Sequence, residues 1–186
     1  MSSQIDHLLD ETRRFAPSEE FAANAIAARE LYDDADADRE AFWAEQARSL
    51  HWHTPFTEVL DWSNAPFARW FGDGELNVAY NCLDRHVEAG NGDRIALLWE
   101  GEPGDERRVT YAELTDEVKR LANVLGELGI GAGDRVAIYM PMIPEAVAAM
   151  LAVARIGAIH SVVFGGFSAD SLRARIDDAG AKLVIT

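Results

Sequence analysis

The feature that most constrains the fold of this chain is a regular alternation of short apolar runs and amphipathic segments in its second half. Apolar runs typical of buried strands lie at 94–100, 135–140, 158–164 and 182–186. Segments with helical periodicity follow the first three runs, at 110–128, 144–154 and 168–179. Strands and helices that alternate in this way predict a parallel sheet with helices on its faces. Because the runs are apolar at nearly every position, we expect strands covered on both faces.

Capping residues mark where these helices begin and end. Thr110 is followed three residues later by Glu113, which is the spacing of a capping box, and Gly129 is expected to end that helix. Ser168 is expected to cap the last helix and Gly180 to end it. Before the first of these helices, residues 102–106 and 107–109 are predicted to form a polar turn and a short return strand.

The first eighty residues have a different texture, with four of the five tryptophans and no clear strand. We expect helices at 19–32, at 39–50 (capped by Asp38) and at 78–89, and an acidic turn at 33–38. Residues 51–77 show no steady period, and their aromatic side chains are expected to cover patches of a larger body. The sequence therefore predicts an α/β chain, with a helical and irregular arm at 1–80 and alternating β-α units at 81–186.

The charge of the chain excludes some partners. It has 32 acidic and 17 basic residues, a net charge of −15, which argues against binding nucleic acid or an anionic membrane through charge. Only Lys119 and Lys182 are lysines, and the acidic residues are spread along the whole length. Scarce lysine and dispersed carboxylates favour a halophile's cytoplasmic protein, with a basic partner or chance as the alternatives.

Cysteine usage and hydropathy limit the class further. A single cysteine, Cys82, allows no intramolecular disulfide and no four-cysteine zinc site, and it fits a reducing cytoplasm. The most apolar stretch, 143–167, is interrupted by Glu145, Arg155 and His160. A membrane helix needs about 20 nearly uncharged residues, so we predict a buried helix followed by a buried strand.

Most motifs that could carry chemistry have structural explanations. Gly129, Gly131 and Gly133 follow a helix and precede a strand, which is the wrong order for a dinucleotide fingerprint and typical of a helix cap and tight turn. Ser161 and Ser168 lack a nucleophile elbow. A phosphate-binding loop of the G-x-x-x-x-G-K-[ST] type is absent from the sequence.

The histidines and acidic pairs are weak candidates as well. His51 and His53 are favoured as part of an aromatic-rich surface segment over a metal site, which would need further ligands. His160 is interpreted as a core histidine, with a catalytic base as the alternative. Asp177 and Asp178 are interpreted as a solvated helix face. We therefore predict no metal ligands and no catalytic residues in this chain.

The best candidate for a binding site is the junction at 164–168. Phe164, Gly165 and Gly166 join the end of a predicted strand to the start of a helix at Ser168. Ligands of open α/β sheets bind at such carboxyl ends, glycines allow close approach, and a helix start offers N–H groups to an anion. From the residues alone, a plain strand-to-helix turn remains the alternative.

A longer stretch of sequence is more specific. Residues 133–186 (GDRVAIYMPMIPEAVAAMLAVARIGAIHSVVFGGFSADSLRARIDDAGAKLVIT) closely resemble the AMP-forming acetate–CoA ligases of the adenylate-forming superfamily. Residues 56–102 resemble the N-terminal region of that family, and the likeness extends over nearly the whole chain after Phe15. The resemblance implies the first part of an α/β AMP-binding domain at 81–186. Ligases for propionate and other short acyl groups are similar here.

The resemblance implies a two-step reaction. Acetate attacks the α-phosphate of ATP to give acetyl-AMP and pyrophosphate, and the thiol of coenzyme A then takes the acyl group and releases AMP. The parent would need ATP, CoA and Mg²⁺ as cofactors and substrates. Its phosphate loop and catalytic lysine have no counterpart before Thr186, and Lys119 and Lys182 match neither context.

One functional feature of the family maps onto this chain. Phe164, Gly165 and Gly166 match the turn that lines the tunnel for the pantetheine of coenzyme A, and they are the predicted CoA-binding residues. Arg173 and Arg175 precede the family's coenzyme A-binding arginine motif and are expected to be surface residues.

Because the sequence stops inside a predicted buried strand, we expect the N-terminal fragment of a haloarchaeal-like, cytoplasmic ligase, inactive by itself. A non-catalytic interaction module, paired with the missing remainder or a full-length ligase, and a free-standing CoA-binding domain are the alternatives.

Overall fold

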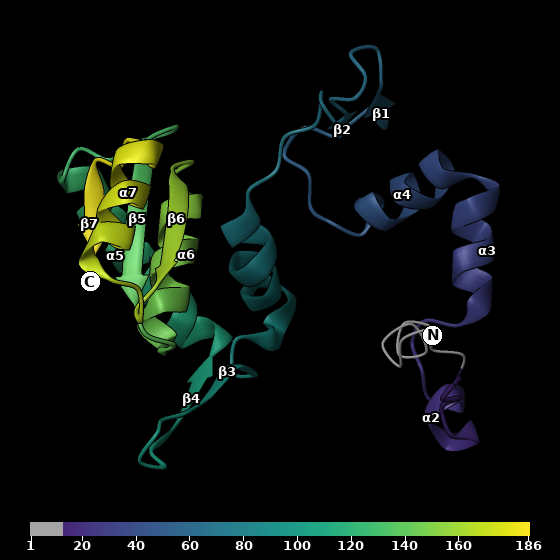
Figure 1. The fold of residues 1–186 in the computed structure, drawn as a ribbon, viewed down its shortest axis with the longest axis horizontal. Coiled ribbons are helices and arrows are strands. Elements are labelled where there is room, and N and C mark those ends of the chain that lie inside the picture. Colours follow the sequence, from purple (N-terminus) through teal and green to yellow (C-terminus); the bar gives the residue numbers. More distant parts are fainter. Residues whose placement is uncertain (1–12) are drawn as a thin grey trace, which may run out of the picture. The chain divides into compact units, whose positions relative to one another are not determined.

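The structure is a computed structural model that describes residues 13–186, so the first twelve residues of the predicted arm lie outside the described part. It divides into two compact units, Met1–Ala47 and Arg48–Thr186. The described part of the first unit is helical, and the second contains three small sheets with their helices (Figure 1). Each unit is described by itself.

The first unit differs from the predicted single helix at 19–32. Two helices, α2 (Glu19–Ala23) and α3 (Arg29–Ala37), are separated by a short break. The side chain of Asn24 donates to the Glu20 carbonyl at 2.9 Å and ends α2. The prediction of an acidic turn at 33–38 is also wrong, since α3 runs through it. An ion pair between Arg29 and Asp33, one helical turn apart at 2.9 Å, supports that helix.

The next helix, α4 (Arg39–Arg48), begins where the sequence predicted. The amide of Ala41 donates to Oδ1 of Asp38 at 2.9 Å, so Asp38 is the expected N-cap.

The irregular segment that opens the second unit forms its own aromatic cluster. Its only described ladder pairs β1 (Leu60–Asp61) with β2 (Arg69–Trp70) in antiparallel fashion. The rings of Trp52, Phe56 and Phe71 lie 4.7–5.7 Å apart between centroids. The expectation that each aromatic covers a separate patch of a larger body is therefore wrong for these three, because their preferred partners are one another.

A carboxylate closes the loop around this cluster. Asp73 accepts hydrogen bonds from the amide and hydroxyl of Thr57 at 2.9 and 2.5 Å and from the amide of Glu58 at 3.3 Å. These bonds, the hydroxyl of Thr57 first, lower the pKa of Asp73.

A helix with two π-helical turns, η1 (Tyr80–Asp84) and η2 (Val87–Asn91), follows as predicted for 78–89. Gly90 takes a positive φ of 82° near its end, a conformation that glycine adopts at little cost. The buried side chain of Asn81 holds His51, accepting from its amide at 2.8 Å and donating to its carbonyl at 2.9 Å.

The same segment is tied to a helix far along the chain, α6 (Pro144–Arg155). Asn77 donates to the carbonyls of Ala154 and Arg155, both at 3.2 Å. Asp84 accepts two hydrogen bonds from the guanidinium of Arg155, at 2.6 and 2.9 Å. These bonds, with the positive charge of Arg155, lower the pKa of Asp84.

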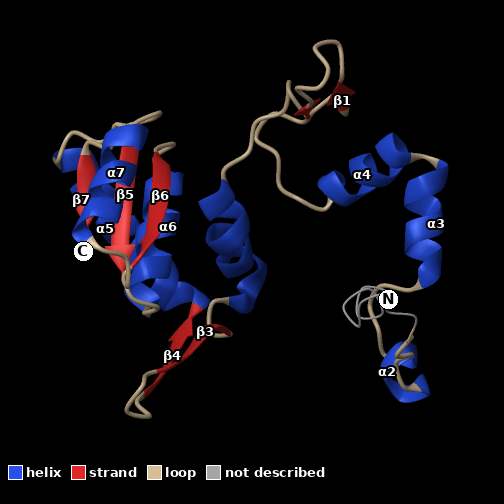
Figure 2. Cartoon of the chain, in the orientation of Figure 1, coloured by secondary structure: helices blue, strands red, loops and turns tan. Residues whose placement is uncertain are grey.

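The strand predicted at 94–100 belongs to a separate hairpin. Strand β3 (Ile95–Glu100) pairs antiparallel with β4 (Glu106–Thr110), in a register that sets Glu100 opposite Glu106. No other strand of the described chain pairs with β3, so its expected place in the parallel sheet is wrong (Figure 2). Strand β4, predicted as a short return strand, follows β3 directly in the sequence. The two can therefore pair as a hairpin, without the long crossover that a parallel neighbour needs.

The parallel sheet has three strands in the order β6-β5-β7. These are β5 (Arg135–Met140), β6 (Ile159–Phe164) and β7 (Leu183–Ile185). The chain steps from β5 to β6 and then back across to β7, so right-handed crossovers put α6 and α7 (Ala169–Ala179) on opposite faces (Figure 1). Helix α5 (Tyr111–Glu127) packs on α6.

The core lies around the central strand and the two packed helices. Val136 and Ile138 of β5 are fully buried, and so are Val118 and Leu125 of α5 and Val153 of α6. The predicted capping box is present: Thr110 Oγ1 accepts from the Glu113 amide at 3.2 Å, while the Glu113 carboxylate accepts from the Thr110 amide at 2.8 Å. The predicted α/β architecture of the second half is confirmed.

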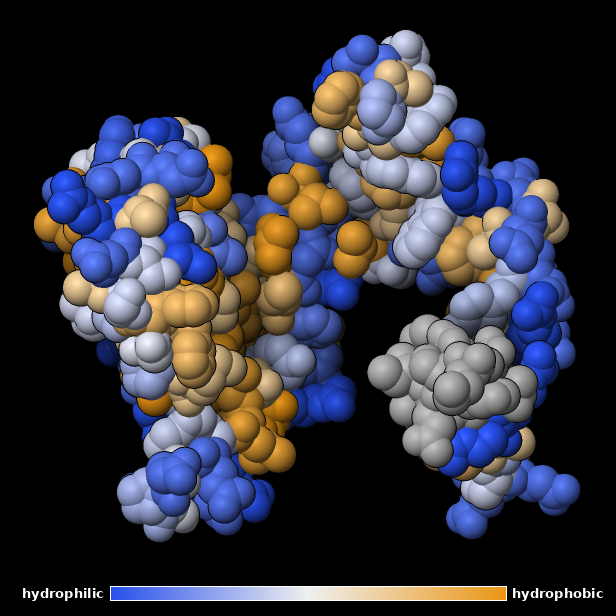
Figure 3. Space-filling view, in the orientation of Figure 1, coloured by the Kyte–Doolittle hydropathy of each residue, from blue (hydrophilic) through white to orange (hydrophobic). Residues whose placement is uncertain are grey.

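Strand β6 departs from the prediction of full coverage. Ile159 is 54% exposed and Val162 is 52% exposed, and only Val163 of this strand is buried. His160 is also exposed, so its interpretation as a core histidine is wrong. The reason is topological, because β6 is an edge strand of the described sheet and pairs only with β5. Figure 3 shows apolar side chains at the surface of the sheet-and-hairpin body.

Candidate functional site

The predicted turn lies at the carboxyl edge of the parallel sheet. Strands β5 and β6 end together, with Met140 paired to Phe164. The chain then reverses, the amide of Phe167 donating to the Phe164 carbonyl at 3.0 Å. Ser168 caps α7, its hydroxyl accepting from the Ser171 amide at 3.3 Å. The structure thus brings Phe164, Gly165 and Gly166 together with a helix start, as the sequence predicted.

The backbone of this turn does not by itself require glycine. Neither Gly165 nor Gly166 has a positive φ. A Cβ built on Gly165 would lie 3.4 Å from the backbone carbon and oxygen of Met140, which is ordinary contact. A Cβ on Gly166 would lie 2.8 Å from Cε1 of the Phe164 ring, which is 61% exposed and has room to move. The fold therefore does not demand a glycine at position 165, and both glycines are exposed at the sheet edge.

A tyrosine from the neighbouring strand holds the turn. The hydroxyl of Tyr139 lies 3.0 Å from the carbonyl oxygen of Gly165 and 2.9 Å from that of Phe167. A hydroxyl carries one proton, so the two carbonyls share it as acceptors of a single donor. This contact could not be predicted from the sequence, because Tyr139 lies within an apolar strand and its partners depend on where the turn returns to β5.

An arginine completes the surroundings of the turn. The guanidinium of Arg175 lies over the ring of Phe167, 4.5 Å from its centroid, and donates to Ser171 Oγ at 2.6 Å. Arg173 points elsewhere and forms an exposed pair with Asp177 at 3.6 Å. Both arginines lie on the surface of α7, as predicted, but the contact of Arg175 with the aromatic ring of the turn was missed.

The loop after β5, residues 141–143, is fixed to the hairpin. Trp99 Nε1 of β3 donates to the Met142 carbonyl at 2.7 Å. Arg107 of β4 pairs with Glu145 at 2.5 Å, and this hydrogen bond lowers the pKa of the Glu145 carboxyl. This loop begins with Pro141, whose nitrogen would lie 3.5 Å from a Cβ on Gly165. The hairpin is therefore joined to the loop through Met142 and to the first turn of α6 through Glu145.

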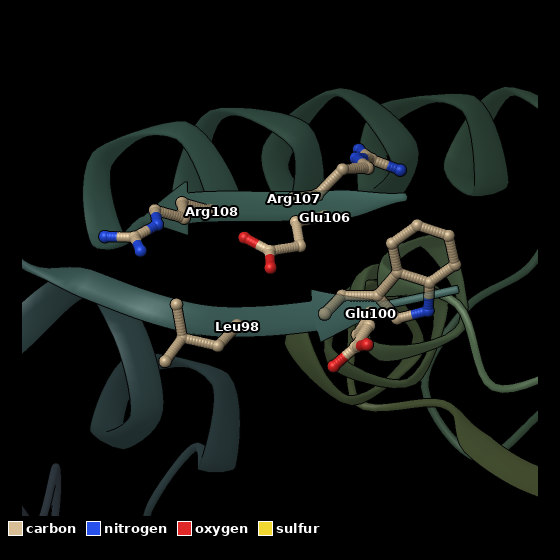
Figure 4. Close-up of a pocket in the computed structure, with 6 residues that line it drawn as sticks. Leu98, Glu100, Glu106, Arg107 and Arg108 are labelled. Carbon is tan, nitrogen blue, oxygen red and sulfur yellow. The ribbon is translucent and has the colours of Figure 1, made fainter. Parts of the chain in front are cut away.

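The hairpin carries an open hollow of about 330 Å³ (Figure 4). Its lining comes from the facing strands β3 and β4: Leu98, Trp99, Glu100, Glu106, Arg107 and Arg108. Two of these side chains already have partners outside the hairpin. Arg107 pairs with Glu145 of α6, and Trp99 donates to the Met142 carbonyl in the loop before α6. The lining contains no serine, cysteine or histidine, so the hollow holds no hydroxyl or thiol nucleophile paired with a histidine.

The glycines at 129–133 and Lys182 have structural contacts in the folded chain. Gly129 and Gly133 have positive φ, and the Gly131 amide donates to Asp134 at 3.0 Å, so this glycine cluster is the predicted cap and turn. Lys182 pairs with Asp134 at 2.5 Å, and that contact comes first in lowering the pKa of Asp134.

His51 and His53 contact residues of their own irregular segment and of the helix that follows it. The ring of His51 lies 4.6 Å from that of Tyr80, and the His53 amide donates to the Glu75 carbonyl at 2.7 Å. Within residues 13–186, His, Cys, Asp and Glu form no group of three or more that could hold a metal ion. In that same range no helix is both long enough and apolar enough to cross a membrane.

Comparison with known families defines the class of this protein. The family model described as "AMP-binding enzyme" matches residues 83–186, more than half of the chain. The chain therefore belongs to the AMP-binding enzymes, and its parallel sheet agrees with the N-terminal part of an adenylate-forming ligase. A second model, "Acetyl-coenzyme A synthetase N-terminus", matches residues 28–82.

Individual relatives narrow the class further. The chain is 68% identical over 185 residues to an acetyl-coenzyme A synthetase of Streptomyces avermitilis, covering 100% of this chain and 28% of that protein. It is 69% identical over 173 residues to one of Mycolicibacterium smegmatis, covering 92% of this chain and 18% of that protein. One of Gemmatimonas aurantiaca is 57% identical over 185 residues, with 99% of this chain and 28% of that protein covered.

These relatives bear on two predictions. The resemblance to acetate–CoA ligases is confirmed, whereas a haloarchaeal source finds no support among the relatives named above. The chain spans 28% of the length of the Streptomyces avermitilis relative.

Proposed function

We propose that this chain is the N-terminal portion of an acetate–CoA ligase that makes acetyl-CoA from acetate, ATP and coenzyme A through acetyl-AMP. The 68% identity to a protein named acetyl-coenzyme A synthetase supports acetate as the acyl substrate. A propionate or other short-chain acyl-CoA ligase is the alternative within the same family. We also propose the division into an arm at 1–80 and the first part of the AMP-binding domain at 81–186, and a cytoplasmic location.

Within this function, we propose that Phe164, Gly165 and Gly166 contact coenzyme A. The observation that carries this assignment is the exposed position of Gly165, where neither φ nor packing requires a glycine. A narrow passage for pantetheine would require it, because any side chain would occupy the passage. The Phe164 ring, 61% exposed beside the two glycines, would supply apolar contact to the pantetheine arm.

ATP and Mg²⁺ would be held elsewhere in the parent protein. Magnesium prefers carboxylate oxygens and substrate phosphates, and the described residues contain no cluster of acidic ligands that fits it. Lys182, which does not match the context of the family's catalytic lysine, is paired with Asp134. The unpaired edge of β6 would receive the remainder of the parent or a full-length ligase.

Two preparations test this proposal. The isolated chain, given acetate, ATP and coenzyme A, should form no AMP above a control without acetate. A chimera in which this chain replaces the equivalent segment of the Streptomyces avermitilis synthetase should form AMP and acetyl-CoA. AMP formation by the isolated chain would contradict the proposal that ATP and Mg²⁺ are held elsewhere in the parent. A folded chimera that is inactive with acetate would contradict the ligase function.

A variant of the chimera tests the binding residues. Gly165→Val should raise KM for coenzyme A at least about tenfold while leaving acetate-dependent ATP–pyrophosphate exchange unchanged, because exchange reports the first half-reaction alone. An unchanged KM would remove Gly165 from the coenzyme A site.

A further inference from the structure

The turn at 164–168 has few internal constraints. Its described backbone hydrogen bond runs from the Phe167 amide to the Phe164 carbonyl, and both glycines lie exposed within it. Glycine loses more conformational freedom on ordering than any other residue. A turn with two adjacent glycines therefore needs an outside contact if it is to present one fixed shape to a ligand.

Tyr139 supplies such a contact from a rigid element. It lies on β5, the central strand, next to Ile138, which is fully buried. Its hydroxyl reaches the carbonyls of Gly165 and Phe167, at 3.0 and 2.9 Å, which bracket Gly166. One donor thus contacts the peptide that precedes Gly166 and the peptide that follows Phe167, so it spans the second glycine and the residue after it.

The same strand supports the turn through its backbone. The carbonyl carbon and oxygen of Met140, the residue after Tyr139, lie 3.4 Å from the position of a Cβ on Gly165. The following loop is held by the bond from Trp99 to Met142. Beyond the turn, Arg175 lies over the Phe167 ring at 4.5 Å. The Tyr139 hydroxyl is the one side-chain hydrogen bond that reaches into the glycine pair itself from β5.

We propose that Tyr139 is a positioning residue whose hydroxyl fixes the glycine turn in the shape that receives coenzyme A. The identity of the ligand, coenzyme A, rests on the proposed function of that turn. The claim that the Tyr139 hydroxyl fixes the shape of the turn does not depend on the ligand. Tyr139 itself touches no reacting atom and acts through the carbonyls of Gly165 and Phe167.

The first test measures the turn in the 186-residue chain, without any ligand. In Tyr139→Phe, which keeps the ring and loses the hydroxyl, hydrogen exchange of the Phe167 amide should accelerate about threefold to tenfold. The Gly180 amide, at the far end of α7, should exchange at its original rate. Tyr32→Phe, which removes a hydroxyl from a tyrosine 61% exposed on α3, is the matched control. Unchanged exchange at Phe167 would overturn the proposal.

The second test measures coenzyme A in the chimeric synthetase. Tyr139→Phe should raise KM for coenzyme A about threefold to tenfold and leave ATP–pyrophosphate exchange unchanged, a split that general destabilisation would not produce. If Gly165→Val raises this KM and Tyr139→Phe does not, Tyr139 is not a positioning residue. If neither raises it while the Phe167 amide exchanges faster, the positioning of the turn stands and its function in binding coenzyme A fails.

Discussion

Replacing Gly165 by alanine should separate the stability of this chain from its function. The added methyl would lie 3.4 Å from the Met140 carbonyl group, within ordinary contact, and the φ of Gly165 suits an L-residue. The substitution also restricts the unfolded chain, which favours folding by about 0.4–1 kcal/mol. We therefore expect a free energy of unfolding that is unchanged or higher by up to about 1 kcal/mol.

The functional effect should be the opposite. Under the proposed function, a side chain at Gly165 narrows the passage for pantetheine, and a tenfold rise in KM for coenzyme A corresponds to about 1.4 kcal/mol. Stability is measured by urea unfolding followed by circular dichroism, with the slope m expected to stay constant. KM is measured in the chimeric synthetase.

Gly131→Ala is the matched control for this prediction. Gly131 also lacks a positive φ, a Cβ there would meet nothing within 4 Å, and it precedes the amino end of β5. It should show the same small effect on stability and no change in KM for coenzyme A. A loss of more than about 1.5 kcal/mol in Gly165→Ala would refute the reasoning, because the fold itself would then require the glycine.

Two further predictions concern stability. Asp84→Asn should lower the free energy of unfolding by about 2–3 kcal/mol in urea unfolding at pH 7, since it breaks a largely buried, two-bond pair with Arg155. Because Arg155 lowers the pKa of Asp84, this contribution is full above the unfolded pKa of about 4 and disappears as pH falls through the folded pKa. Thr110→Ala should cost about 1 kcal/mol in the same assay, by removing the acceptor for the Glu113 amide.

Each of these predictions has a control. Asp33→Asn alters an exposed pair with Arg29 and should change stability by less than about 0.5 kcal/mol. If Asp84→Asn costs no more than that, or keeps the wild-type acid dependence, the pair with Arg155 does not stabilise the fold. Thr110→Ser keeps a hydroxyl acceptor and should retain most of the stability. An equal loss in the serine and alanine variants would argue against the cap.

The sequence predicted most of the second unit because its signals are local. The capping pair Thr110 and Glu113, the cap at Ser168 and the positive φ at Gly180 depend on residues within one or two helical turns. Continuous apolar runs marked β5 and β6 with nearly the observed bounds. Local signals also failed in places: the acidic run at 33–38 was predicted as a turn, whereas α3 runs through most of it.

The candidate site was predicted in position but not in its supports. Phe164, Gly165 and Gly166 could be found from a strand end, a glycine pair and a helix cap in sequence. Tyr139 and Arg175 could not, because their contacts depend on how β5 and α7 pack around the turn. The exposure of His160 could not be predicted either, because a central strand and an edge strand can have the same apolar sequence pattern.

By itself the sequence determined the helices and strands of residues 94–186, the parallel architecture and the family, since these follow from periodicity, capping and motif order along the chain. Tertiary structure alone decided strand order, which left β6 at an edge and β3 in a separate hairpin. It alone also brought Asp84 to Arg155 and Tyr139 to Gly165. These contacts join residues distant in the chain, and their free energy appears only when packing brings the partners within hydrogen-bonding distance.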